Sequence, residues 1–296
     1  MSIKRLLGAV VTGAMIFAYG GQVMAAQVDP SKNEYDKYAT AISTNEIVDV
    51  SLSADNDNLD AYKITAPSTG DYMVKILGYD AGKDDCPVVT VCFNNRGEAV
   101  FLGDNFNYTE DYGSTVEFYM DKGKEYLFLA CTYNSYTASD FSFFIFKKPS
   151  ANSWVKAENK WFYYSAAKND FLTGWQKIGG QWYLFDNEGL MLTGWQRSGG
   201  KWYYLASSGA MLTGWQRIGG TWYFLKSGGD MASNEYCGGY WLNADGSWTY
   251  QHKAKWTKDK TGWWYGDTSG WYAKSASYVI DGKSYNFNAS GYCTNP

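Results

Sequence analysis

Residues 174–193 read GWQKIGGQWYLFDNEGLMLT, and the two stretches of twenty residues that follow repeat this pattern. The copies at 194–213 and 214–233 keep the Gly-Trp-Gln start, the Gly-Gly pair, the Trp-Tyr pair and a late Gly-x-Met. A looser copy precedes them and carries Trp154 and Trp161 at the same seven-residue spacing. A fixed period of this length indicates a solenoid or an array of repeats.

Each unit is expected to form one short β-hairpin followed by a loop. The Gly179-Gly180 pair and its equivalents supply the positive φ angles that a tight hairpin turn requires. The flanking residues, such as 181–185, are aromatic and favour strands. Because an isolated hairpin is only marginally stable in water, neighbouring units are expected to stack their aromatic faces and share stability.

The unit resembles the choline-binding, or cell-wall-binding, repeats of Gram-positive surface proteins. The resemblance is carried by Gly174-Trp175, by Gly180-x-Trp182-Tyr183 and by Gly189-x-Met191-x-Thr193-Gly194, each of which recurs in tandem. It implies that choline binds between consecutive hairpins, in a cage made by two Trp of one repeat and a Tyr of the next, with a Met nearby.

Transferred to this chain, the resemblance predicts three cages and two methionines that line their walls. The residues are Trp154, Trp161 and Tyr183; Trp175, Trp182 and Tyr203; Trp195, Trp202 and Tyr223; and Met191 and Met211. The alternative is that these rings only form the core of the solenoid. Side chains alternate along a strand, so Trp182 and Tyr183 are expected on opposite faces, and at least one of them is structural in its own repeat.

The first 25 residues are expected to be a signal peptide. Lys4 and Arg5 precede an apolar stretch at 6–19, and Val23-Met24-Ala25 fits a cleavage site. A transmembrane anchor is the alternative, but the apolar run is short and no second one follows. Cleavage after Ala25 or Ala26 leaves 24 basic against 30 acidic residues, a net charge of about −6, which argues against a nucleic-acid partner.

Residues 29–149 are expected to form an all-β domain, because short strand-like runs alternate with turn signals as in a β-sandwich. The order of features resembles the bacterial pre-peptidase C-terminal domain, a secreted jelly-roll-like sandwich. That resemblance is carried by residues 57–64, by Pro67-x-x-Gly70-x-Tyr72 and by Gly123-x-x-Tyr126-x-Phe128. All 14 Trp lie between 154 and 271, which places a domain boundary near Pro149.

The predicted organisation is therefore an N-terminal β-sandwich followed by a β-hairpin solenoid. The repeats occupy 153–233, and 234–296 is a degenerate continuation that caps the stack. Neither a hydrophobic C-terminal tail nor a lipid-accepting Cys after the cleavage site is present in this sequence. Retention at the cell surface is therefore expected to depend on the repeats.

No catalytic, metal or cofactor site is predicted. His252 is the single histidine, and none of the five cysteines has the local setting of a Cys-His nucleophile. Asp55, Asp57 and Asp60 lack the spacing of an EF-hand calcium loop, so a solvated turn is the simpler interpretation. Among the cysteines, a cross-strand Cys92–Cys131 disulfide and unpaired buried thiols are both possible.

Two functions follow from the sequence. The first is a secreted, non-catalytic surface protein held on choline-bearing cell-wall polymers, such as teichoic acid, and displaying the sandwich. The alternative is a carbohydrate-binding module that recognises glycans or wall polysaccharide, since stacked Trp and Tyr also suit sugar rings. An enzyme ranks third, because the chain offers no candidate lytic domain.

Overall fold

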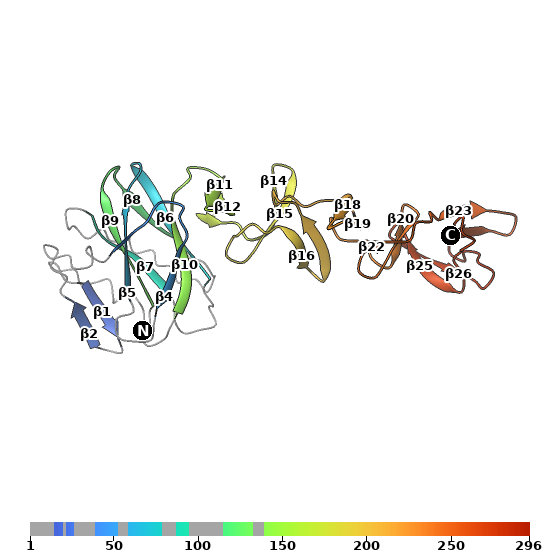
Figure 1. The fold of residues 1–296 in the computed structure, drawn as a ribbon, viewed down its shortest axis with the longest axis horizontal. Coiled ribbons are helices and arrows are strands. Elements are labelled where there is room, and N and C mark those ends of the chain that lie inside the picture. The colour runs from blue at the N-terminus through green and yellow to red at the C-terminus, as the bar shows by residue number, and fades with distance from the viewer. Residues whose placement is uncertain are drawn as a thin grey trace. The chain divides into compact units, whose positions relative to one another are not determined.

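The computed structural model describes residues 15–19, 22–26, 39–52, 59–78, 87–94, 115–132 and 139–296. These residues form strands, turns and loops without any helix (Figure 1), so the predicted all-β class is confirmed. None of them belongs to a helix long and apolar enough to cross a membrane. Most of the predicted signal peptide lies outside the described residues, apart from β1 (Met15–Tyr19) and β2 (Gln22–Ala26), which pair antiparallel.

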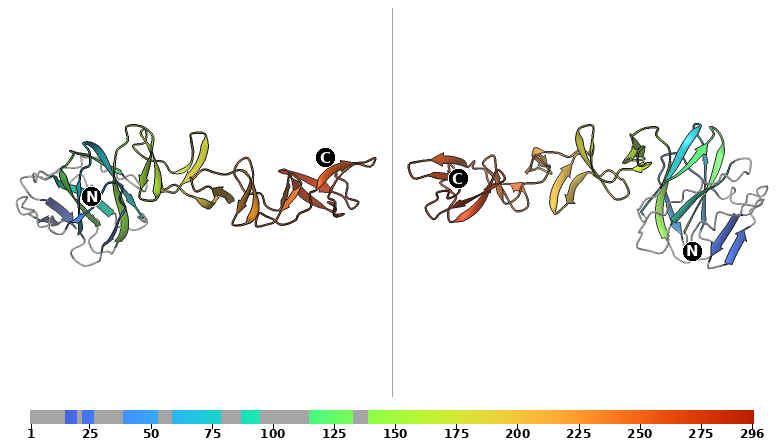
Figure 2. Two further views of the ribbon diagram at one scale, coloured as in Figure 1. Left: turned by 45° about the horizontal axis from the view of Figure 1, so that its top comes forward. Right: turned by 180° about the vertical axis from the view of Figure 1, so that it is seen from behind.

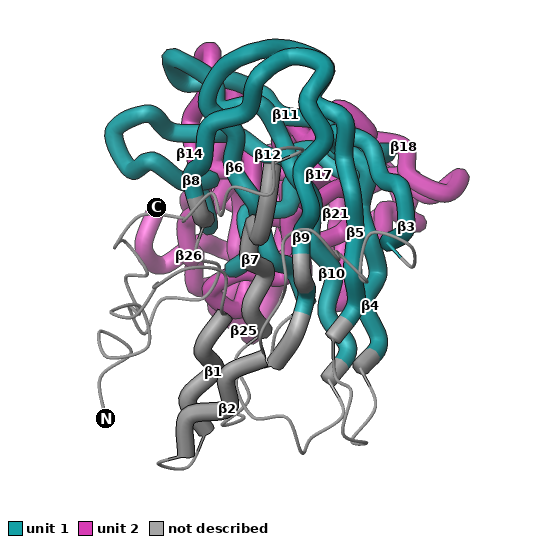
Figure 3. Tube along the Cα trace, turned by 90° about the vertical axis from the view of Figure 1, so that its left-hand side faces the viewer, with its two compact units in different colours: residues 1–174, 185–191 teal, residues 175–184, 192–296 magenta. Residues whose placement is uncertain are grey.

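The chain divides into two compact units (Figure 3). Unit 1 contains residues 1–174 and 185–191, and unit 2 contains residues 175–184 and 192–296.

Unit 1 contains two four-stranded sheets that share one apolar core. The first has the order β4-β10-β6-β8 and the second β3-β5-β9-β7. Their bounds are β3 Thr40–Ala41, β4 Val48–Leu52, β5 Leu59–Thr65, β6 Gly70–Leu77, β7 Pro87–Asn94, β8 Thr115–Met120, β9 Glu125–Thr132 and β10 Ser139–Lys147. Side chains from both sheets meet in this core, for example Tyr62 and Phe143, whose ring centroids lie 5.3 Å apart.

The sheet that contains β6 and β10 is covered on both faces. Its other face carries Met73, Leu77, Phe144 and Phe146. A small sheet packs on that face, made of β11 (Ser153–Ala157), β12 (Lys160–Ser165) and β13 (Asp170–Phe171). Residues 153–171, which the sequence groups with the repeats, therefore bury an apolar face within unit 1.

One buried cation accompanies this packing. Lys75 lies on β6 and is 2% exposed. Its Nζ is 3.4 Å from an oxygen of Asp170 and 5.8 Å from the centroid of the Phe171 ring. Because burying an isolated charge is costly, the paired carboxylate is what allows a lysine at this position.

The backbone register does not support a Cys92–Cys131 disulfide, which is one of the two alternatives for these cysteines. In the antiparallel pairing of β7 with β9, Cys131 lies opposite Val88, and the register shifts between Val91 and Phe93. Cys92 lies four positions along the strand from Val88, roughly 13 Å, which exceeds the reach of a disulfide. Of the other cysteines, Cys86 lies outside the described residues, and Cys237 and Cys293 are free thiols.

Unit 2 contains a succession of small hairpin sheets (Figure 2). The repeats give β14 (Gly174–Ile178) with β15 (Gln181–Phe185), β16 (Gly194–Ser198) with β17 (Lys201–Leu205), and β18 (Gly214–Ile218) with β19 (Thr221–Leu225). The predicted turn chemistry is confirmed: Gly199 and Gly200 have φ angles of 54° and 77°, and the equivalent pairs are similar.

The C-terminal part of unit 2 continues with hairpins of its own. Its strands are β20 (Glu235–Cys237), β21 (Tyr240–Leu242), β22 (Ser247–Trp248), β23 (Lys255–Lys258), β24 (Trp263–Gly266), β25 (Ala276–Ile280) and β26 (Lys283–Phe287). β21-β20-β25-β26 form one sheet, β23 pairs with β24, and β22 adds to β19. Tyr236, Tyr265 and Phe287 are among the buried residues of an aromatic core here.

Backbone hydrogen bonds join each repeat to the one before it. The N–H of Met211 donates to the carbonyl of Trp182 at 2.8 Å, and the N–H of Met231 donates to that of Trp202 at 2.8 Å. Met211 also forms a bridge with Leu205 of its own repeat, as Met231 does with Leu225. The loop of one repeat is therefore paired to the hairpin of its predecessor.

Candidate functional site

The two tryptophans of a repeat stand nearly perpendicular to each other. The centroids of Trp175 and Trp182 are 6.5 Å apart at an interplanar angle of 82°, and those of Trp195 and Trp202 are 6.4 Å apart at 89°. The second tryptophan is the exposed one, at 41% for Trp182 and 43% for Trp202. These two repeats thus each present a right-angled pair of indole rings whose second ring is open to solvent.

A tyrosine of the following repeat completes each pair. The ring of Tyr203 lies 4.9 Å from that of Trp175, and the ring of Tyr223 lies 5.0 Å from that of Trp195. We call this arrangement of two Trp and one Tyr a three-ring corner. The structure therefore brings together two of the three predicted groups, Trp175 with Trp182 and Tyr203, and Trp195 with Trp202 and Tyr223.

The residues of the first predicted group are divided between the two compact units. Trp154 and Trp161 form the same perpendicular pair, with centroids 6.3 Å apart at 89°, and Trp161 is 38% exposed. Tyr183 belongs to the other compact unit. Its grouping with Trp154 and Trp161 therefore stays a prediction.

The Trp-Tyr dipeptides show how one strand serves two corners. Trp202 faces Trp195 of its own repeat, whereas its neighbour Tyr203 contacts Trp175 of the preceding repeat. Successive side chains of a strand point to opposite faces, so the dipeptide divides between two corners. The rings therefore have both roles considered in the sequence analysis, holding repeats together and lining open corners.

The backbones of the two predicted methionines are hydrogen-bonded to the second tryptophan of the preceding hairpin, and the side chain of Met211 packs against a glycine of the following repeat. The N–H groups of Met191 and Met211 donate to the carbonyls of Trp161 and Trp182, each at 2.8 Å. The Met211 side chain occupies the space where a Cβ on Gly229 would stand. This packing explains the recurrent Gly-x-Met pattern, and the predicted lining role of Met191 and Met211 stays a prediction.

A further three-ring corner lies in the segment that the sequence analysis assigned to a degenerate cap. Trp256 and Trp263 are perpendicular, with centroids 6.4 Å apart at 88°, and Tyr285 lies 4.8 Å from Trp256. Trp263 is 38% exposed, and its carbonyl accepts the N–H of Cys293 at 2.7 Å, as Trp182 accepts that of Met211. The seven-residue spacing of the two Trp was the signal that could have revealed this corner.

The repeat at 214–233 is closed differently. The ring of Trp215 contacts Tyr240 at 5.7 Å and Trp248 at 5.6 Å. Trp248 also lies opposite Trp222 in the β19–β22 pairing. The indole of Trp248 therefore lies among the rings of this repeat, and their arrangement differs from that of a three-ring corner.

Several titratable groups of unit 2 are buried or paired with neighbouring side chains. Burial raises the pKa of the Cys237 thiol to about 12, with a smaller contribution from the carboxylate of Glu235. Glu235 itself is buried and pairs with Lys226 at 2.5 Å. The ring of His252 packs on Tyr250 at 5.2 Å, and the hydroxyl of Tyr250 donates to Asp267 at 2.6 Å. No group of three potential metal ligands occurs among the residues that the structure describes.

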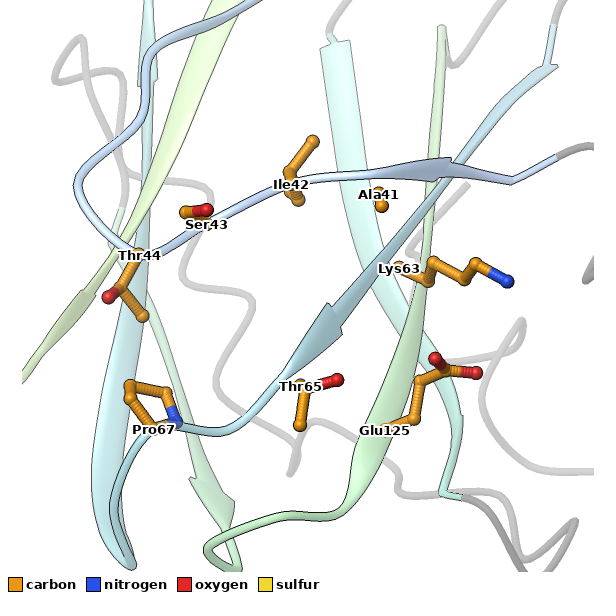
Figure 4. Close-up of a pocket in the computed structure, with 8 residues that line it drawn as sticks. All are labelled: Ala41, Ile42, Ser43, Thr44, Lys63, Thr65, Pro67 and Glu125. Carbon is orange, nitrogen blue, oxygen red and sulfur yellow. The ribbon is translucent and has the colours of Figure 1, made fainter.

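Unit 1 carries an open pocket of about 270 Å³ at the end of β5 (Figure 4). It is lined by Ala41, Ile42, Ser43, Thr44, Lys63, Thr65, Pro67 and Glu125. Lys63 and Glu125 are the charged groups of this lining.

Of the predicted acidic turn, Asp60 accepts a hydrogen bond from Tyr62 at 3.4 Å, and Asp55 and Asp57 lie outside the described residues.

The repeats match a known protein family. The choline-binding repeat family matches residues 172–213 and 192–236, so this part of the chain consists of choline-binding repeats. The chain is similar to the choline-binding domain of Spr1274 of Streptococcus pneumoniae, with 40% identity over 27% of this chain and 96% of that one, at a TM-score of 0.26. No curated protein sequence matches the chain.

Two other similar structures are larger proteins. Choline binding protein F of Streptococcus pneumoniae, solved with a peptidoglycan analogue, is 24% identical over 70% of this chain and 64% of its own, at a TM-score of 0.34. A multimodular pneumococcal cell wall endolysin of phage Cp-1, complexed with choline, is 31% identical over 45% of this chain and 42% of its own, at a TM-score of 0.29.

Proposed function

We propose that the protein is a secreted, non-catalytic surface protein that attaches through its three-ring corners to choline-bearing cell-wall polymers. The observation that carries the proposal is the open, perpendicular indole pair closed by a tyrosine of the next repeat. A trimethylammonium group cannot form hydrogen bonds, and the negative faces of aromatic rings attract it. Teichoic acid is the wall polymer that we propose as the bearer of the choline.

A single corner would bind weakly. Each cation–π contact contributes roughly 0.5–2 kcal/mol, so three rings give about 4 kcal/mol, which corresponds to a dissociation constant near 1 mM. Several corners on one chain meet many pendant groups on one polymer. Because later contacts are then intramolecular, weak corners combine into firm attachment.

We further propose that the two-sheet domain of unit 1 is of the pre-peptidase C-terminal type and is displayed at the surface. Its support is the shared core of two four-stranded sheets. We also propose that the protein is not a catalyst, and its single histidine, His252, packs its ring on Tyr250 at 5.2 Å. Incubation with purified peptidoglycan and analysis of the products tests it, and released muropeptides would overturn it.

Retention on choline-agarose tests the attachment. The full chain should bind the resin and elute with free choline. A triple variant, Trp182→Ala, Trp202→Ala and Trp263→Ala, should bind far less, because each change removes one open ring. Tyr119→Ala is the matched control, since Tyr119 is a 52% exposed ring of unit 1. Saturable binding to a glycan array that choline does not disturb would instead favour the carbohydrate-binding module.

A further inference from the structure

Five hairpins have a tryptophan as the second residue of their first strand, and each of them carries a cation at the same position. Two residues after the first Trp, the chain carries Lys or Arg in all five cases: Lys156, Lys177, Arg197, Arg217 and Lys258. The intervening residue varies, from Val to Gln to Thr. This regularity extends beyond the residues that match the repeat family, to the hairpin of β23 and β24.

The register puts this cation beside the exposed indole. Lys156 lies opposite Trp161, Arg197 opposite Trp202, and Lys258 opposite Trp263. Directly opposite residues share one face of a hairpin. The Nζ atoms of Lys156 and Lys258 lie 5.5 Å from the ring centroids of Trp161 and Trp263. In the Arg217 hairpin the guanidinium Nε donates to the Gly220 carbonyl at 3.3 Å, and a guanidinium carries four further N–H donors.

The distribution of charge along the chain also favours an anionic ligand group at the repeats. Residues 153–296 contain fourteen basic and ten acidic residues, whereas residues 26–152 contain ten basic and twenty acidic ones. The segment with the corners is therefore net positive, although the protein as a whole is acidic. A surface that served only cations would be expected to carry the opposite sign.

A bare quaternary ammonium meets a like charge at this position, which weakens its binding. A ligand with an anion a few bonds from its ammonium meets an opposite charge, and Lys and Arg are the usual partners of phosphate oxygens. We propose that the cation two residues after the first Trp is a specificity-determining residue that binds the phosphate of a phosphodiester-linked trimethylammonium group. This inference rests on the proposed function, because it requires the ring corners to hold the ammonium.

Calorimetric titration of the full chain with choline and with glycerophosphocholine tests the inference. At low ionic strength the wild type should bind glycerophosphocholine about three- to tenfold more tightly than choline, and added salt should reduce this preference. In a variant with all five cations replaced by Gln, the preference should fall to about onefold while choline binding persists. The substitutions are Lys156→Gln, Lys177→Gln, Arg197→Gln, Arg217→Gln and Lys258→Gln.

A control variant separates a local effect from a change in net charge. It replaces five other lysines of the same segment and should keep the preference of the wild type. The substitutions are Lys160→Gln, Lys168→Gln, Lys255→Gln, Lys260→Gln and Lys283→Gln. Equal affinity of the wild type for both ligands, an unchanged preference in the first variant, or an equal loss in the control would overturn the inference. If neither ligand binds the wild type, the proposed function fails as well.

The same phosphocholine chemistry occurs on wall polymers and on lipid headgroups. Sedimentation with phosphocholine-bearing wall polymer and with phosphatidylcholine vesicles distinguishes these sources. The inference predicts that the five-cation variant loses affinity for whichever source the wild type binds. Undiminished sedimentation of this variant with that source would overturn it.

Discussion

The two tryptophans of a repeat have different environments although they look alike in the sequence. The ring centroid of Trp195 lies within 6.4 Å of those of Trp202, Tyr204 and Tyr223, whereas the side chain of Trp202 is 43% exposed. The first ring therefore contributes to packing between repeats, and the second contributes mainly an open face. Substitutions at the two positions should separate stability from binding.

Trp202→Ala should remove about one binding site per molecule and lower the free energy of unfolding by less than about 1 kcal/mol, because an exposed ring is lost. Trp195→Ala should cost about 2 kcal/mol or more, because it also removes contacts with both tyrosines. Calorimetric stoichiometry and denaturant unfolding measure the two effects. Similar stability losses in both variants would contradict this division.

The glycine of the Gly-x-Met pattern is required for two reasons, its positive φ angle and its close contact with a methionine of the preceding repeat. Gly229 has a φ of 86°, and a Cβ there would overlap the Met211 side chain. Gly229→Ala should therefore destabilise unit 2 by about 2–4 kcal/mol. Gly219→Ala is the matched control, with a φ of 57° and no atom within 4 Å of the added Cβ, and should cost only about 1 kcal/mol. Thermal unfolding measures both variants. Similar losses of stability in Gly229→Ala and Gly219→Ala would show that the contact with Met211 does not matter.

The buried thiol of Cys237 should make unit 2 sensitive to alkali. Its pKa is about 12 in the fold, against an ordinary value of 9.0, because burial disfavours the thiolate. The folded state therefore keeps a proton that the unfolded state releases. This stabilisation is fully present below pH 9 and is lost as the pH rises from 9 towards 12.

Urea unfolding at pH 8, 9 and 10 measures this loss. Buried Tyr236 and Tyr265 have raised pKa values and act in the same direction, so the comparison must be with Cys237→Ala. The variant should lose less stability per pH unit than the wild type. Parallel curves would show that the thiol does not contribute.

At the scale of the element, the hairpin of β11 and β12 differs from those that follow. It keeps the perpendicular Trp pair on one face and buries Phe162 on the other, against Phe144 at 5.0 Å. The run Phe141 to Phe146 in β10 is apolar on both faces, which is typical of a strand covered on both sides. The apolar run could be read from the sequence. Residues 153–171 were nevertheless expected to belong to the repeat array, because Trp154 and Trp161 have the seven-residue spacing of the repeats.

Phe162→Ala should therefore destabilise unit 1 rather than the repeats. The expected loss is about 3–5 kcal/mol, because a fully buried ring is replaced by a cavity. Hydrogen exchange read out by mass spectrometry localises the effect, and β6 and β10 should lose protection. Faster exchange confined to 194–233 would contradict this assignment.

The sequence predicted the hairpins, their glycine turns and two three-ring corners, because twenty-residue periodicity and ring spacing depend on local residues. It did not predict the corner at Trp256, Trp263 and Tyr285. There the Met position is held by Cys293 and the Tyr lies 22 residues beyond the second Trp, against 21 in the regular repeats. It also did not predict the packing of Phe162 on Phe144, which depends on contact between segments distant in the sequence.

At the scale of the whole molecule, binding should scale with the number of repeats. Deleting residues 194–213 joins Thr193 to Gly214 and restores the Thr-Gly junction of the array. We expect the shortened protein to fold, to lose about one site per molecule and to wash from a choline-bearing polymer at lower choline concentration. Circular dichroism checks folding, and an unchanged stoichiometry would count against independent corners.

The bond from the Met211 amide to the Trp182 carbonyl has a consequence for how such a chain can change over generations. A copy of the unit finishes its backbone pairing only when its successor is present, so half a copy would leave a ladder incomplete. Gene duplications and losses are therefore tolerated in whole copies. The number of corners would then change by whole numbers during evolution, and the avidity would change with it, without redesign of any single ring.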